Sequence, residues 1–168
     1  MAGGPVKMIV CLGNRLFDQD AAGPLVYDRL VADEAARDIE LLEGGTAGLN
    51  LLPLLRGRKR IVFVDAVAGL GEPGEVAAWS AEQLRALPLE PHYGHEAGLL
   101  YLLHALPATT PEAPTAIFLV GLEGVPTAQA ITQAARLALD LAHDQDDRGS
   151  LSCFTTGERH GNATTHAG

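Results

Sequence analysis

Short apolar runs that alternate with longer segments of helical period constrain the fold of this chain most strongly. The clearest run, residues 61–64, contains only β-branched and aromatic side chains, and further apolar runs cover residues 6–12, 39–42 and 115–120. Residues 23–36 and 127–144 instead repeat apolar side chains at helical spacing. This alternation is typical of a parallel sheet with helices on both faces. We therefore predict an α/β fold with a mostly parallel, twisted sheet in three layers.

The length and hydrophobicity of the chain indicate one domain. A chain of 168 residues with 47% hydrophobic content can bury one substantial core, and no repeat or Gly/Ser linker divides it. We place this α/β domain at residues 1–148. Hydrophobicity falls away after that point, so residues 149–168 are predicted to be a flexible C-terminal tail. Residues 75–79 are interpreted as an edge or hairpin strand, and residues 95–106 as a helix.

Charge and cysteine content exclude several classes of partner. The net charge of -9 leaves no broad basic surface for nucleic acid, and we interpret the short basic cluster at residues 56–60 as a solvated turn before a strand. The first ten residues are too polar for a signal peptide or a membrane span. Cys11 and Cys153 are far apart and lack CxxC spacing. We expect a cytoplasmic protein with reduced thiols and no membrane partner.

Three side chains are candidates for a metal site at the carboxyl edge of the predicted sheet. Asp20 lies in a segment between the first strand and the following helix, Asp65 ends a buried strand, and His95 lies at a predicted loop-to-helix junction. Active sites of open α/β sheets gather at this edge. Two carboxylates and one imidazole would leave open positions on a divalent metal. The chain has neither a GxGxxG nor a GK[ST] phosphate motif in this region, which disfavours nucleotide binding.

A purely structural explanation exists for each of these residues. Asp20 can be a helix cap or turn residue, Asp65 a solvated strand end, and His95 an exposed helix start. The Gly44-Gly45 pair can be a tight bend that allows a strand and a helix to pack closely. Residue types and spacing alone leave both explanations open.

The order of several motifs resembles a known family. The motifs are Gly13-Asn14 followed by Asp20 and Gly23, then Glu43-Gly44-Gly45-Thr46-Ala47-Gly48, Val64-Asp65-Ala66, Pro73-Gly74 and His95-Glu96-Ala97-Gly98-Leu99. In this order they resemble the hydrogenase maturation endopeptidases, which remove a C-terminal peptide from the large subunit of nickel-iron hydrogenases. The likeness covers about residues 6 to 125.

The resemblance implies a phosphorylase/hydrolase-like fold and a nickel-dependent endopeptidase. The family's catalytic and metal-binding positions fall on Asp20, Asp65 and His95, with nickel supplied by the hydrogenase large-subunit precursor. Substrate binding is expected at four further residues: Asn14, Gly44, Gly45 and Thr46.

This chain departs from the family pattern at four positions. Gln19 replaces the usual Asp, Asp20 is often Glu in the family, Glu43 replaces Asp, and Cys11 replaces Gly. The change at Asp20 shortens the proposed ligand by one methylene, and Gln19 removes a neighbouring charge.

Two other functions are weighed against this one. A non-catalytic nickel-binding maturation chaperone would carry the same ligands, and only binding without cleavage would distinguish it. A peptidyl-tRNA hydrolase also begins with a strand followed by Leu-Gly-Asn, as at Leu12-Gly13-Asn14, but its Thr-Arg-His-Asn motif is absent after Leu16. The acidic charge is also a poor surface for tRNA.

Overall fold

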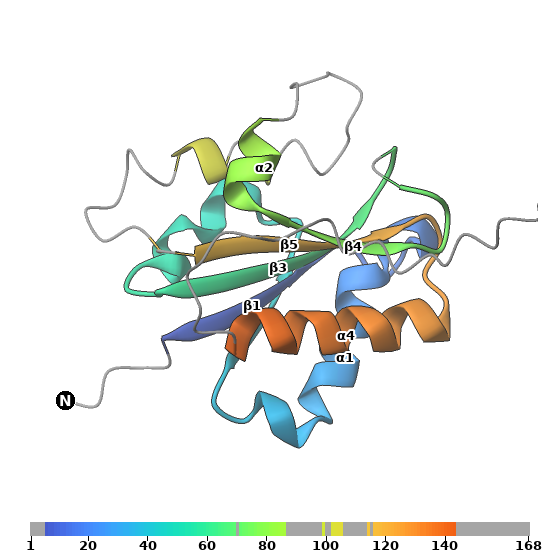
Figure 1. The fold of residues 1–168 in the computed structure, drawn as a ribbon, viewed down its shortest axis with the longest axis horizontal. Helices are drawn as coiled ribbons and strands as arrows, with labels where there is room; N and C mark the ends of the chain where they lie inside the picture. The colour runs from blue at the N-terminus through green and yellow to red at the C-terminus, as the bar shows by residue number, and fades with distance from the viewer. Residues whose placement is uncertain are drawn as a thin grey trace, which may run out of the picture.

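The protein forms one five-stranded sheet with strand order β2-β1-β3-β5-β4 (Figure 1). The computed structural model describes residues 6–69, 71–86, 99, 102–105, 114 and 116–143. The strands are β1 (Lys7–Leu12), β2 (Glu40–Gly45), β3 (Arg60–Val67), β4 (Val76–Ser80) and β5 (Ala116–Glu123). Four of them run parallel, and β4 pairs antiparallel with β5 at one edge. The predicted mostly parallel sheet and the edge strand near residues 75–79 are confirmed.

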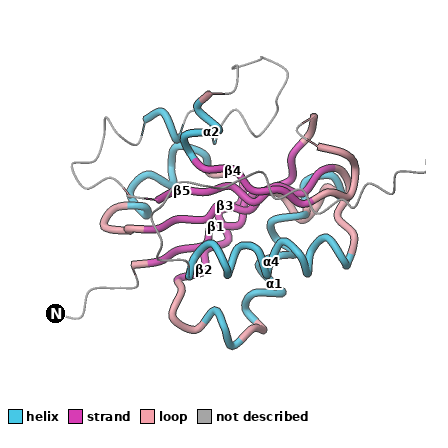
Figure 2. Tube along the Cα trace, in the orientation of Figure 1, coloured by secondary structure: helices cyan, strands magenta, loops and turns pink. Residues whose placement is uncertain are grey.

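Helices cover both faces of this sheet (Figures 1 and 2). The α-helices are α1 (Ala22–Val31), α2 (Ala81–Arg85) and α4 (Ala128–His143), and the 3-10 helices are η1 (Asp18–Asp20), η2 (Glu34–Ala36) and η3 (Gly48–Leu55). Helices α1 and α4 lie on one face, whereas η3 and α2 lie on the other. The predicted three-layer fold is therefore confirmed. The predicted tail at residues 149–168 lies outside the described residues and stays a prediction.

Alternating side chains of each strand fill two separate cores. In β1, Ile9 and Cys11 face α1 and α4, whereas Met8 and Val10 face η3. Such alternation follows from the two-residue repeat of a β-strand. The face of α4 that packs on the sheet is rich in alanine, which allows a close approach between helix and sheet: Ala130, Ala134, Ala135, Ala138 and Ala142. Both faces of the central strands are thus buried, as expected for a parallel sheet.

The strands extend further toward their carboxyl ends than their apolar runs predict. β3 continues through Asp65 to Val67, and β5 continues through Gly121 to Glu123, because these two strands pair in register over their whole length. β2 likewise includes the Gly44-Gly45 pair, which the sequence placed in a turn. Backbone hydrogen bonding therefore continues where the side chains become small or polar.

The helix predicted at residues 23–36 divides into two elements. Helix α1 ends at Val31, and the short helix η2 begins after Asp33. The Asp33 side chain accepts a hydrogen bond from the Ala35 amide at 3.0 Å, so it caps η2. This cap starts a new helical turn in place of a continuation of α1.

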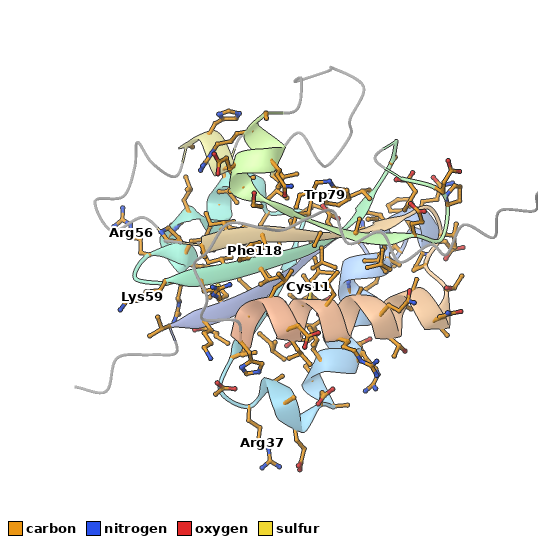
Figure 3. All side chains as sticks on the ribbon, viewed as in Figure 1. Cys11, Arg37, Arg56, Lys59, Trp79 and Phe118 are labelled. Carbon is orange, nitrogen blue, oxygen red and sulfur yellow. The ribbon has the colours of Figure 1, made fainter. Side chains whose placement is uncertain are left out.

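Part of the basic cluster stabilises the fold, so the interpretation of the whole cluster as a solvated turn was wrong. Arg60 donates a hydrogen bond to the Leu141 carbonyl at 2.8 Å and lies over the Phe118 ring, 5.3 Å from its centroid. Arg58 forms an ion pair with Glu40. Arg56 and Lys59 are exposed, as predicted, and lie at the amino edge of the sheet (Figure 3).

Within the described ranges, every helix is too short or too polar to span a bilayer. The cytoplasmic location expected from the sequence stays a prediction.

We predict that Arg60→Ala lowers the free energy of unfolding by about 2 kcal/mol, because the change removes a charged hydrogen bond and a cation–π contact. Urea unfolding followed by circular dichroism measures this loss. Arg56→Ala, an exposed change in the same cluster, serves as the control and should have little effect. Equal stability of the two variants would contradict the assigned role of Arg60.

Candidate active site at the carboxyl edge

The loop between β1 and α1 folds back on itself at the carboxyl edge of the sheet. Gly13 has a φ of +124°, and a Cβ at this position would lie 2.2 Å from the Asp20 carbonyl oxygen. The Asn14 amide donates to that same oxygen at 2.9 Å. Only glycine accommodates both the backbone angle and the contact. The first glycine of the predicted motif therefore closes the loop that carries Asp20.

Asn14 holds the inside of this loop. Its side-chain oxygen accepts a hydrogen bond from the Leu16 amide at 3.0 Å, and its backbone carbonyl accepts one from Phe17 at 3.2 Å. The Phe17 carbonyl in turn accepts from the Asp20 amide at 2.8 Å. Asn14 thus has a structural role that the sequence did not predict, and its expected role in substrate binding stays a prediction.

Arg15 ties the loop to two neighbouring elements. Its guanidinium donates to both carboxylate oxygens of Asp28 in α1, at 2.7 and 2.8 Å, and to both of Glu43 in β2, at 2.7 and 3.0 Å. Hydrogen bonding to Arg15 lowers the pKa of Asp28, and the two carboxylates raise the pKa of Arg15. Sequence reasoning missed this cluster because Arg15, Asp28 and Glu43 lie on three separate elements and form no local pattern.

Helix α1 approaches the end of β1 very closely at Gly23. A Cβ at this position would lie 1.8 Å from the Leu12 carbonyl oxygen. The second glycine of the motif therefore fixes the start of α1 directly against the strand that leads into the loop.

The glycine pair at the end of β2 produces an irregularity in the sheet. Cys11 pairs with Glu43, but the next residue, Leu12, pairs with Gly45, so Gly44 is an extra residue in β2. Gly45 has a φ of +55°, and its carbonyl accepts a hydrogen bond from the Gly13 amide at 3.0 Å. Thr46 follows as an exposed turn residue. This geometry supports the structural explanation of the pair without testing its predicted role in substrate binding.

Asp65 is buried inside β3, so the alternative of a solvated strand end is wrong. It is 2% exposed, and it is the only buried polar or charged side chain among the described residues. Its Oδ1 accepts a hydrogen bond from the Ala66 amide at 2.8 Å. A buried carboxylate has a large desolvation cost unless its surroundings compensate the charge. Its burial in the central strand makes Asp65 a candidate for a functional role.

The structure brings the first two predicted ligands to the same edge of the sheet. Helix η1, which contains Asp20, packs against β3, which contains Asp65. One carboxylate oxygen of Asp20, Oδ2, is inaccessible to solvent. Figures 1 and 2 show η1 beside the carboxyl ends of the central strands, where the loop after β3 and the connection from β5 to α4 also lie.

The third predicted ligand, His95, lies outside the described residues. In the part of the chain that the structure describes, no group of three or more His, Cys, Asp or Glu side chains is arranged to hold a metal ion. His143 has a structural role, because its Nε2 donates to the Ala35 carbonyl at 2.9 Å. The predicted three-residue site therefore stays a prediction, with two of its members placed on neighbouring elements.

Cys11 lies close to the site but is not a suitable nucleophile. The residue is fully buried in the core beneath α1 and α4 (Figure 3). Burial, and then the negative charges of Glu43, Asp65 and Asp28, raise the pKa of its thiol far above the usual range. Because the thiolate is the reactive form, this protonated and inaccessible thiol is inert.

Comparison with known proteins places this chain in one family. Residues 25–145 match the family model described as HycI, hydrogenase maturation protease. The chain is 31% identical over 117 residues to the hydrogenase 2 maturation protease of Escherichia coli strain K12, covering 68% of this chain and 71% of that protein.

Solved structures agree with this match. An endopeptidase from E. coli superposes with a TM-score of 0.63 at 28% identity, covering 79% of this chain and 88% of the other. The [NiFe] hydrogenase maturation protease HybD from Thermococcus kodakarensis superposes with a TM-score of 0.57 at 28% identity, covering 80% and 95% of the two chains.

The chain belongs to the hydrogenase maturation protease family. The resemblance seen in the sequence motifs is thereby confirmed, as are the endopeptidase function and the family fold. The match also favours the peptidase over the alternative of a peptidyl-tRNA hydrolase.

We predict that Arg15→Gln raises the pKa of Asp28 back toward the usual value of about 3.9, because the change removes the charge that stabilises the Asp28 carboxylate. A lowered pKa in the folded state means that the pair adds stability above the unfolded pKa and loses it as the pH falls through the folded pKa. Carboxyl titration by NMR measures the shift, and a pKa of Asp28 that is equal in both proteins would contradict the assigned contact.

We predict that Gly23→Ala destabilises the protein severely, by about 3 kcal/mol or more, because the new Cβ would overlap the Leu12 carbonyl. Thermal unfolding measures this effect. Arg29→Ala, an exposed change in the same helix, is the control. If Gly23→Ala unfolds at the wild-type temperature, the close contact between α1 and β1 is incorrect.

Proposed function

We propose that this protein removes the C-terminal peptide from the nickel-loaded large-subunit precursor of a nickel-iron hydrogenase, with Asp20, Asp65 and His95 contacting the nickel that the precursor carries. The observation that supports this proposal is the position of Asp20 and Asp65 on packed elements at one edge of the sheet, in a family of maturation proteases. Nickel is here a feature of the substrate that the enzyme recognises.

The surroundings of the two carboxylates suit a divalent cation. Asp65 is almost fully buried, and Asp20 has one inaccessible oxygen, so a positive charge between them would be weakly screened by water. Carboxylate and imidazole groups are suitable ligands for a borderline divalent metal and leave positions for a substrate. These two residues would hold the metal-bearing end of the precursor in place while the peptide bond is cut.

The position of His95 in the sequence is consistent with a third ligand. His95 precedes Leu99 by four residues, and Leu99 packs in the same core as Phe63 and Val67. Phe63 and Val67 alternate with the neighbouring residues of β3 and so share a face with Asp65. Leu99 therefore packs on the face of β3 that carries Asp65.

The glycine pair and Thr46 support a role for β2 in holding the peptide. β2 is the outer strand of the sheet next to β1, and the described residues include no strand on its other side. An extended peptide can add to such an edge through backbone hydrogen bonds. We propose that the precursor's tail lies along the end of β2 near Gly44, Gly45 and Thr46, beside the loop that contains Asn14.

Cleavage of the precursor tests this function directly. The purified protein is incubated with a large-subunit precursor that bears its C-terminal tail, either loaded with nickel or free of nickel, and intact mass follows the products. Release of one defined peptide from the nickel-loaded sample alone is the expected result. Binding without release would instead support the maturation chaperone, and no binding to either precursor would overturn the proposed function.

We predict that Asp20→Asn and Asp65→Asn each reduce processing of the nickel-loaded precursor at least about 100-fold, by removing a negative charge at the metal without changing side-chain size. His95→Gln should have a similar effect. Asp140→Asn, an exposed change in α4, is the control and should retain activity. Wild-type rates in folded Asp20→Asn and Asp65→Asn proteins would rule out these residues as ligands.

A further inference from the structure

The loop that carries Asp20 also presents two large apolar side chains to solvent. Leu16 is 85% exposed and Phe17 is 63% exposed. By contrast, Val10 in β1 and Val26 in α1 are fully buried in the cores. Adjacent exposed apolar residues on one loop are a common feature of protein-binding surfaces.

The exposure of this pair follows from an ordered loop. Three backbone hydrogen bonds join Asn14, Phe17 and Asp20, and the side chain of Asn14 accepts from Leu16. The guanidinium of Arg15 fixes the loop to Asp28 in α1 and to Glu43 in β2. The loop therefore keeps Leu16 and Phe17 exposed to solvent in a defined position. The Phe17 carbonyl also accepts a hydrogen bond from the Asp20 amide.

Two further exposed apolar residues follow the parallel strands β2 and β5 at the same edge of the sheet. Leu49 is 53% exposed near the start of η3, just after β2, and Val125 is 57% exposed just after β5. The connections that follow β1 and β5 lie at the same end of the sheet in Figures 1 and 2. We call Leu16, Phe17, Leu49 and Val125 the apolar rim.

We propose that the apolar rim docks the folded body of the precursor protein, with Leu16 and Phe17 as its centre. This inference rests on the proposed function and extends it from the tail and the metal to the surface that surrounds them. Phe17 lies close to Asp20, because the Phe17 carbonyl accepts a hydrogen bond from the Asp20 amide at 2.8 Å, so a molecule that covers Phe17 is near the candidate site. The rim therefore shares its occupant with the candidate active site.

The charges around the rim indicate the chemistry of that occupant. Asp18 is exposed beside Phe17, and the positive charge of Arg15 is already matched by Asp28 and Glu43. The surface around the apolar centre is thus acidic. Its complement is a protein face with an apolar centre and basic residues around it.

Steady-state kinetics on the nickel-loaded precursor tests this proposal. The double variant Leu16→Ser/Phe17→Ser is compared with Val31→Ser/Leu54→Ser, which changes two exposed apolar residues toward the opposite edge of the sheet. Loss of the centre of a protein interface should raise KM about tenfold or more while kcat at saturation is retained. The control variant should keep the wild-type KM, and thermal unfolding should show that both variants are folded.

Each outcome separates this inference from the proposed function. A wild-type protein that cleaves the precursor and a rim variant with unchanged KM would overturn the docking surface alone. A wild-type protein that leaves the precursor uncut and unbound would overturn the proposed function. If sedimentation shows a wild-type dimer that the rim variant converts to monomer with unchanged KM, the rim binds a second copy of the chain, and the proposal is wrong.

Discussion

The closure of the loop between β1 and α1 determines the geometry of the candidate active site. The Gly13 amide donates to the Gly45 carbonyl, and the Asn14 amide donates to the Asp20 carbonyl, so one short segment is bonded both to β2 and to itself. The positive φ of Gly13 makes these two hydrogen bonds compatible. Without this closure, neither Asp20 nor the exposed Leu16-Phe17 pair would have a fixed position relative to the sheet.

The central strand supplies the second part of the site from a very different environment. Asp65 is held in β3 between two parallel neighbours, with little access to water, whereas Asp20 lies on a short surface helix. In the proposed site, the buried group would provide a rigid carboxylate, and the loop would provide a second carboxylate close to the approaching substrate. A site built in this way is rigid on one side and open to a protein partner on the other, as a processing peptidase requires.

The sequence predicted the layers, the parallel sheet and the family, because apolar runs and ordered motifs record those features directly. The apolar run predicted that β3 ends at Asp65, although hydrogen bonding to β5 continues the strand to Val67. It also missed the contacts of Arg15 with Asp28 and Glu43, since these join residues far apart in sequence. The sequence correctly predicted that Asp20 lies at the carboxyl edge of the sheet. The glycine contacts that hold it there depend on atomic distances, which residue spacing does not contain.

The proposed function depends on a divalent metal that contacts both carboxylates at this edge of the sheet. Paramagnetic Ni²⁺ broadens the NMR signals of nearby amides, and free Ni²⁺ added in excess to the isotopically labelled protein stands in for the nickel that the precursor carries. We expect selective broadening of amides in residues 13–20 and 65–68, which disappears in the Asp20→Asn variant. Broadening centred on His143, or a pattern that Asp20→Asn leaves unchanged, would contradict it.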